Sequence, residues 1–163
     1  MTLMSQTSIH IIVGEHIFAA TLADTPTGEA FAQLLPLNLS MNELNGNEKY
    51  YYLDSSLPTD SYKPGTIQCG DLLLYGNNCV VLFYETFSSS YSYTRIGAVN
   101  DPSGLAEALG ASNVSVRFEK KTKTDLSPAI SARERVKILC DGQLYLIYQG
   151  TKYNVQGIKI NQQ

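Results

Sequence analysis

The residues best suited to chemistry surround a serine-rich segment in the middle of the chain. Tyr84, Tyr91, Tyr93 and Arg95 flank the run Ser88-Ser89-Ser90. Aromatic rings with hydroxyl tips, together with one guanidinium, favour recognition of a peptide, a glycan or a small anion. The alternative is structural, with the tyrosines filling a core and Arg95 pairing with a neighbouring carboxylate. The sequence therefore predicts a binding surface here and leaves the structural interpretation open.

Other polar residues offer weaker candidates for catalysis or metal binding. Asp71 follows Gly70 and would be a general acid or base, but an aspartate in such a turn more often accepts hydrogen bonds from backbone N–H groups. His10 and His16 flank a predicted hairpin and would face each other across it, yet two histidines without a third ligand make a poor metal site. The sequence contains no nucleophile elbow and no glycine-rich phosphate loop. We therefore predict no metal and no cofactor.

Composition excludes several classes of partner. The 163 residues carry a net charge of -3, whereas nucleic-acid binding requires concentrated lysine and arginine. The three cysteines lack CxxC spacing, so we expect free thiols and neither a zinc site nor a redox motif. No apolar run approaches the roughly 18 residues that span a membrane. Residues 1–8 lack the features of a signal peptide, which predicts a cytoplasmic protein unless a leader has been removed.

Short β-prone segments separated by turns must position these residues. Segments 9–13 and 16–22 are joined by Gly14-Glu15, which is typical of a two-residue type II′ hairpin. The segments 71–75 and 79–84 are almost continuously apolar, so we expect both of their faces to be covered. Further strands are predicted at 37–41, 49–53, 66–68, 92–99 and 114–119.

Two short helices interrupt the strands. Asp24 or Thr25 caps the first, Pro26 occupies its first turn, and Pro36 ends it. The second is predicted to open at Asp101-Pro102 and to stop at Gly110. Many short strands with only two helices indicate a mainly β fold, an antiparallel barrel or sandwich in which the helices cap the open ends.

The composition changes after residue 120. Residues 121–132 form a polar stretch that looks like a linker, and residues 133–163 predict a small meander of two or three strands. We therefore predict a barrel domain at 8–120, a linker at 121–132 and a C-terminal appendage at 133–163.

Read in order, several motifs resemble those of the bacterial cyclophilin-like fold proteins over residues 8–119. They are the opening hairpin with the helix ending in Leu35-Pro36, Gly70-Asp71-Leu72, Phe83-Tyr84, and the segment from Tyr93 to Val99 followed by Asp101 and Gly104-Leu105. The resemblance implies a closed β-barrel capped by a helix at each end.

The same resemblance raises the question of peptidyl-prolyl isomerase activity. Cyclophilins use an Arg near a Phe, followed by a Pro-Gly-Phe-Met-x-Gln-Gly-Gly-Asp segment. In the counterpart at residues 63–71, Gln68, Gly70 and Asp71 match in type, but the Phe-Met pair is absent and Tyr62 or Lys63 stands near the Arg position. If the chain is an isomerase, Gln68 and Asp71 are its catalytic candidates.

The tail carries a second resemblance. The segments 140–147 and 150–157 are similar to the C-terminal segment of many exported Bacteroidota proteins, with a pattern of the type D/NGQLYI…GxxYxxxGxxV. This implies a periplasmic or extracellular location.

Three hypotheses follow from the sequence. The first is non-catalytic binding of a peptide or small molecule in one cleft on the barrel, lined by Tyr62, Gln68, Tyr84, Tyr93 and Arg95. The second is a weak prolyl isomerase that uses the same cleft. The third is a structural or export-linked protein that acts through its C-terminal strands. None of the three assigns an oligomeric state.

Overall fold

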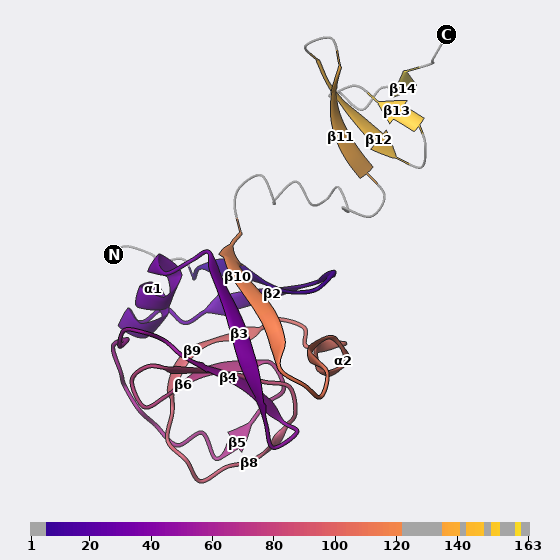
Figure 1. Ribbon diagram of the computed structural model, residues 1–163. Coiled ribbons are helices and arrows are strands. Elements are labelled where there is room, and N and C mark those ends of the chain that lie inside the picture. Colours follow the sequence, from indigo (N-terminus) through magenta and orange to yellow (C-terminus); the bar gives the residue numbers. More distant parts are fainter. Residues whose placement is uncertain (1–5, 122–134, 141–142, 149–150, 154–158, 161–163) are drawn as a thin grey trace. The chain divides into compact units, whose positions relative to one another are not determined.

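A computed structural model describes residues 6–121 with their side chains (Figure 1). Beyond them it describes the backbone of residues 135–140, 143–148, 151–153 and 159–160. The chain divides into two compact units, Met1–Lys121 and Thr122–Gln163. Apart from Lys121, the predicted linker at 121–132 lies outside the described residues.

The second unit contains a four-stranded antiparallel sheet, where two or three strands were predicted. Its strands are β11 (Arg135–Cys140), β12 (Gln143–Tyr148), β13 (Thr151–Tyr153) and β14 (Lys159–Ile160), paired in that order. The prediction was short by the two-residue strand β14, which is too brief to leave a period-two pattern in the sequence.

The first unit is a closed antiparallel barrel with the strand order β1-β10-β3-β4-β7-β6-β9-β2. This confirms the predicted mainly β, cyclophilin-like barrel. The strands are β1 (Ser8–Val13), β2 (His16–Leu22), β3 (Leu37–Leu44), β4 (Glu48–Tyr52), β6 (Asp71–Tyr75), β7 (Cys79–Phe83), β9 (Thr94–Val99) and β10 (Val114–Lys120). Outside the barrel, β5 (Thr66–Ile67) pairs with β8 (Phe87–Ser88) in a small two-stranded sheet.

Turn chemistry sets the first hairpin as predicted. Val13 pairs with His16, leaving Gly14 and Glu15 as the two turn residues. Gly14 has φ +60 and Glu15 has a negative φ, which is the pattern of a type II′ turn. The turn therefore fixes the register of β1 on β2.

Two short helices complete the unit and insert apolar residues into the barrel interior. In α1 (Pro26–Gln33), Thr25 is the N-cap and its hydroxyl accepts a hydrogen bond from the Gly28 N–H at 3.1 Å. Phe31 of α1 is fully buried and meets Phe118 edge to face. The second helix, α2 (Leu105–Leu109), ends at Gly110 as predicted.

The predicted start of the second helix was wrong. The helix begins at Leu105 rather than at Asp101-Pro102, because Gly104 adopts a left-handed conformation with φ +82 just before it. Asp101 instead accepts a hydrogen bond from the Ser103 N–H at 3.1 Å in the preceding turn. Neither helix is long and apolar enough to cross a membrane, and the described residues contain no other helix.

Strands β6 and β7 are buried on both faces, as their continuous apolar sequences predicted. Their inward side chains, such as Leu72 and Leu82, join the large core inside the barrel. Their outward side chains form a second, smaller core on the outer wall. This outer core contains Ile67, Leu73, Cys79, Val81, Phe83 and Tyr93, with Tyr50 and Phe87 packed against it. The β5-β8 sheet and the chain between β7 and β9 contribute three of these residues, and they cover the wall.

Candidate ligand-binding site

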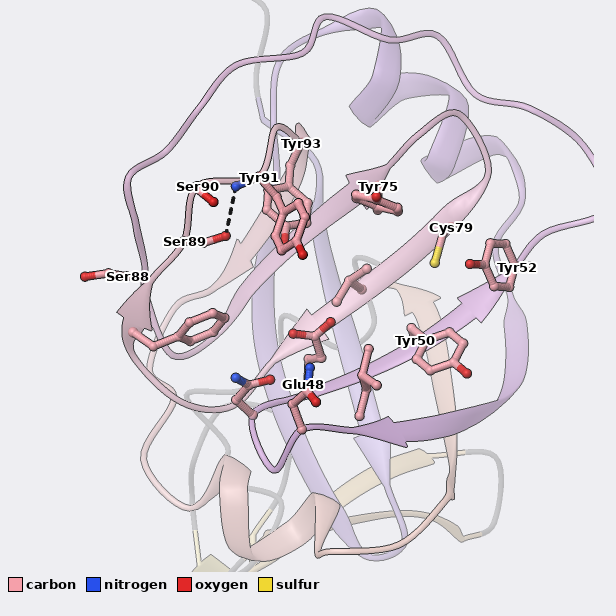
Figure 2. Close-up of a pocket in the computed structure, with 15 residues that line it drawn as sticks. Glu48, Tyr50, Tyr52, Tyr75, Cys79, Ser88, Ser89, Ser90, Tyr91 and Tyr93 are labelled. Carbon is pink, nitrogen blue, oxygen red and sulfur yellow. Dashed lines mark hydrogen bonds between the residues drawn. The ribbon is translucent and has the colours of Figure 1, made fainter.

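The outer core forms one side of an open pocket of about 460 Å³, which we call the tyrosine pocket. Its walls combine five tyrosines, three serines and two asparagines with a few apolar side chains (Figure 2). The lining residues are Leu44, Asn45, Asn47, Glu48, Tyr50, Tyr52, Tyr75, Cys79, Val81, Phe87, Ser88, Ser89, Ser90, Tyr91 and Tyr93.

The alternation of strand β4 explains three of the lining residues. Successive side chains of a strand point to opposite faces, so Glu48, Tyr50 and Tyr52 all face the pocket on the outer side of the barrel. Figure 2 shows Tyr50 and Tyr52 on one side of the cavity and Tyr91 and Tyr93 on the other, with Glu48 projecting between them in this view. One strand therefore supplies the acid and two of the five tyrosines.

Edge-to-face contacts hold the tyrosine rings. Tyr50 meets Tyr52 with ring centroids 5.8 Å apart, and Tyr75 meets Tyr91 at 6.2 Å with an interplanar angle of 89°. Tyr93 contacts Tyr75 at 5.8 Å and is only 5% exposed, whereas Tyr91 is 61% exposed. Tyr93 is thus a fixed part of the pocket floor, and Tyr91 stands at its rim.

The charge of the pocket comes from Glu48. Within the described part of the chain, it is the only lining residue with a formal charge at neutral pH, and no described side chain forms a salt bridge or hydrogen bond with it. Burial raises its pKa, and the nearby charge of Glu43 raises it further. Above that raised pKa the pocket holds one unpaired negative charge.

Neither Cys79 nor Asn47 supplies an activated group. Burial raises the pKa of the Cys79 thiol to about 11, so the thiol stays protonated at neutral pH and is a poor nucleophile. The Asn47 amide oxygen is buried and accepts no hydrogen bond from any described residue. Two acceptors among the lining residues therefore receive no hydrogen bond from a described residue, namely the Glu48 carboxylate and the Asn47 oxygen, and the second of these is closed off from solvent.

Tyr84, one of the predicted ligand-binding residues, lies in the barrel interior. It is 6% exposed, and its hydroxyl donates a hydrogen bond to Glu43 Oε1 at 2.6 Å. The same oxygen accepts a hydrogen bond from the ammonium of Lys49 at 2.7 Å, and this ammonium lies 5.2 Å from the centroid of the Tyr84 ring. Tyr84 is therefore part of a buried ionic network.

Lys49 is the centre of that network and is fully buried. Its ammonium also donates to the carbonyl oxygens of Gly110 at 2.7 Å and Ser112 at 2.6 Å. Burial alone would raise the pKa of Glu43, but hydrogen bonds from Lys49, Tyr84 and the Gly46 N–H, with the charge of Lys49, outweigh it and hold the pKa below its ordinary value. The network joins β3 and β4 to the chain that follows α2.

Arg95 and Tyr62 line a second cavity, of about 380 Å³, which we call the Arg95 pocket. Its other lining residues are Thr25, Pro26, Thr27, Pro58, Thr59, Asp60 and Thr94. Arg95 Nη1 lies 3.6 Å from Asp71 Oδ1, which agrees with the structural interpretation of Arg95. Asp71 Oδ2 accepts a hydrogen bond from the Gln68 N–H at 2.9 Å, so this carboxylate stabilises the turn before β6.

The five predicted binding residues are thus distributed over different places. Tyr62 and Tyr93 are joined by paired backbone hydrogen bonds of 2.8 and 2.9 Å, but Tyr62 lines the Arg95 pocket and Tyr93 the tyrosine pocket. Gln68 is exposed and, like Tyr84, lines neither cavity. Glu48, Tyr50, Tyr52 and Tyr75 were not among the predicted residues.

The predicted arrangement of the two histidines was wrong. The two-residue turn pairs His16 with Val13 and His10 with Ala19, so the histidines do not face each other. Among the described residues, no group of three His, Cys, Asp or Glu side chains is placed to hold a metal ion. Cys69 and Cys79 are both free thiols, as expected.

Comparison with known proteins gives the class of this barrel. Residues 11–119 match the cyclophilin-like family, and the chain belongs to that family. Among solved structures, it is similar to the solution structure of a hypothetical protein from Archaeoglobus fulgidus, at 16% identity and a TM-score of 0.47 over 71% of this chain and 95% of that one. No curated protein matches it significantly.

We expect Glu48→Gln to stabilise the protein at neutral pH. The folded-state pKa of Glu48 is raised by burial and by Glu43, so ionisation of Glu48 as the pH rises through that pKa costs folding free energy. Because Glu48 is only partly buried, solvent screening limits the gain to about 0.5 kcal/mol. Urea unfolding at pH 7.5 should show a higher midpoint for Glu48→Gln, and the difference should vanish below the ordinary glutamate pKa. Glu15→Gln in the exposed hairpin turn is the control, and a lower midpoint for Glu48→Gln at pH 7.5 would contradict the prediction.

Proposed function

We propose that this cyclophilin-like protein is a non-catalytic binding protein that takes a peptide or a small molecule in the tyrosine pocket. The observation that carries the proposal is a pocket of about 460 Å³ lined by five tyrosines, of which Tyr93 belongs to the second core outside the barrel and Tyr50 packs against it. Ligand sites are concave, largely formed before binding, and lined by aromatic side chains with a few polar groups.

The outer core supports the proposal because it fixes the pocket before a ligand arrives. Phe83 contacts both Phe87 and Tyr93, at 5.7 and 5.6 Å between ring centroids, so the chain that covers the wall is anchored by buried aromatic residues. A wall that is already ordered loses little conformational entropy on binding. The serine hydroxyls and the tyrosine hydroxyls then supply directional hydrogen bonds.

The Arg95 pocket is a weaker candidate for the site. Its cation already has a carboxylate neighbour in Asp71, and Thr27 donates its hydroxyl hydrogen to the Pro58 carbonyl at 2.7 Å. By contrast, the tyrosine pocket presents the Glu48 carboxylate, to which no described residue donates a hydrogen bond. A ligand can therefore form more new hydrogen bonds or ion pairs in the tyrosine pocket than in the Arg95 pocket.

The non-catalytic part of the proposal depends on the loss of isomerase features. Catalysis by a cyclophilin-type face would use Gln68 and Asp71, but Gln68 lies outside both described cavities and Asp71 is engaged by the Gln68 N–H and Arg95.

The periplasmic or extracellular location stays a prediction, because it depends on the resemblance of residues 140–157 to the C-terminal segment of exported proteins. Fractionating cells that express the protein would test it.

The test is a titration of the full chain with a set of single-ring aromatic fragments. We expect Tyr75→Ala/Tyr91→Ala to weaken binding about tenfold or more, because the variant removes an edge-to-face pair from the pocket wall. Both residues are exposed, so the fold should persist. Tyr62→Ala, in the Arg95 pocket, is the matched control.

Two outcomes would contradict the proposal. The first is equal loss of fragment affinity in Tyr62→Ala and in the double variant. The second is catalysed isomerisation of a proline-containing tetrapeptide, above the uncatalysed rate, that disappears in Gln68→Ala. That second result would establish the isomerase hypothesis in place of the non-catalytic one.

A further inference from the structure

Among its described residues, the tyrosine pocket holds a carboxylate and no cation, which favours a positively charged ligand. Its lining holds one carboxylate, Glu48, and a buried amide oxygen, that of Asn47, and neither receives a hydrogen bond from a described residue. Leaving a buried acceptor without a donor costs free energy, and this cost is larger for a charged group. The lining residues carry no cation that would relieve it.

The contrast with the neighbouring acid, Glu43, sharpens this point. Glu43 receives the ammonium of Lys49 at 2.7 Å, the hydroxyl of Tyr84 at 2.6 Å and the N–H of Gly46 at 2.8 Å. Glu48 lies on β4, the strand that pairs with β3, and receives none of these hydrogen bonds. The fold thus neutralises one of two nearby carboxylates with its own residues and leaves the other facing the pocket.

Aromatic rings surround the unpaired carboxylate. Tyr50 and Tyr52 follow it on β4, and Tyr75, Tyr91 and Tyr93 form the opposite aromatic group through contacts of 5.8 and 6.2 Å. The faces of such rings attract cations, most often the guanidinium of arginine. A planar guanidinium also offers five N–H donors in a fork that matches a carboxylate, with donors left over for nearby hydroxyl oxygens.

We infer that the tyrosine pocket binds an organic cation of the guanidinium type, either as the side chain of an arginine residue in a peptide or as a free guanidino compound. The inference rests on the proposed function, because it assigns the ligand class of the same pocket. In the complex, Glu48 pairs with the cation, and the tyrosine rings pack against its faces. The volume of about 460 Å³ leaves room for groups on either side of the cation.

The test compares two ligands of nearly equal shape and different charge. N-acetyl-arginine amide carries a guanidinium, and N-acetyl-citrulline amide carries a neutral urea in its place. We expect the wild-type protein to bind the arginine compound at least about tenfold more tightly, in line with a charge-assisted hydrogen bond. Glu48→Gln should remove this preference, whereas Glu15→Gln should retain it. Agmatine, measured alongside, distinguishes the sources: binding as tight as that of the arginine compound supports a free cation, and weaker binding supports a peptide.

The outcomes separate the inference from the proposed function. Equal affinity for the arginine and citrulline compounds would overturn the inference and leave the proposed binding function intact. Binding of the arginine compound that Glu48→Gln does not weaken would also overturn it. If neither compound binds while the aromatic fragments still occupy the tyrosine pocket, the inference alone fails. If the fragments do not occupy it either, the proposed function fails as well.

Discussion

Lys49→Met should destabilise the barrel by about 3 kcal/mol, because the substitution removes a fully buried ammonium and leaves its partner, the partly buried Glu43 carboxylate, without a cation. Glu43 Oε1 would lose its cationic donor and keep only the Tyr84 hydroxyl, and the carbonyl oxygens of Gly110 and Ser112 would lose the ammonium as well. A buried acceptor that loses its only donor costs roughly 1–3 kcal/mol, and the exposed positions of Gly110 and Ser112 place their carbonyl oxygens at the low end of this range. The measurement is the free energy of unfolding in urea at pH 7.

Two comparisons make this result specific to the network. Lys120→Met removes the same charge from an exposed position at the end of β10 and should change the free energy of unfolding by less than about 0.5 kcal/mol. In Lys49→Met/Glu43→Leu both charges are absent, and the double variant should recover part of the loss because no uncompensated carboxylate remains. A Lys49→Met protein as stable as Lys120→Met would show that the ammonium does not hold β3, β4 and the chain after α2 together.

Gly97→Ala should be comparably damaging, by about 3 kcal/mol, because the added Cβ would overlap backbone atoms of the neighbouring strand. A Cβ at Gly97 would lie 2.4 Å from the Thr21 carbonyl oxygen and 3.0 Å from the Leu22 Cα. Both are backbone atoms of β2, and Gly97 pairs with Leu22 where β9 meets β2. The added methyl group would therefore force apart two strands of a closed barrel.

Gly65→Ala is the control for this prediction. A Cβ at Gly65 meets no atom within 4 Å, but the residue has φ +76, so the substitution carries only the cost of a left-handed backbone, about 1 kcal/mol. Thermal unfolding of both variants should show a much larger loss for Gly97→Ala. Equal losses would mean that β2 and β9 separate without penalty at this position.

Much of the fold was predictable because local patterns and tertiary structure agree. Gly14-Glu15 predicted the first hairpin, and Pro26 with its neighbouring cap predicted the first helix. The continuous apolar runs of β6 and β7 predicted strands covered on both faces, which the interior and outer cores confirm. The two-residue strand β8 was not predictable, since its pairing with β5 depends on contacts distant in sequence.

The candidate site was harder to predict, because side-chain direction matters more than residue type. Tyr84 was grouped with Tyr93 as a binding residue, yet it faces the interior and bonds to Glu43. Extending the alternation of β7 by one residue would have placed Tyr84 inward, next to Leu82 and opposite in direction to Phe83.

The same alternation in β4 was the available signal for the true pocket lining. It places Glu48, Tyr50 and Tyr52 on one face and Lys49 on the other. No local pattern could indicate that the face of β4 that carries Lys49 is the buried one. Its partners, Glu43 and the carbonyl oxygens of Gly110 and Ser112, come together only in the closed barrel.

The central claim, that the tyrosine pocket is the ligand site of this cyclophilin-like protein, is tested most directly by mapping bound fragments on the isotope-labelled full chain by NMR. We predict that single-ring aromatic fragments shift the backbone resonances of Tyr50, Tyr75 and residues 87–93 and leave those of Thr59 and Asp60, in the Arg95 pocket, unchanged. Shifts confined to the Arg95 pocket, or no saturable shift around the tyrosine pocket, would contradict the claim.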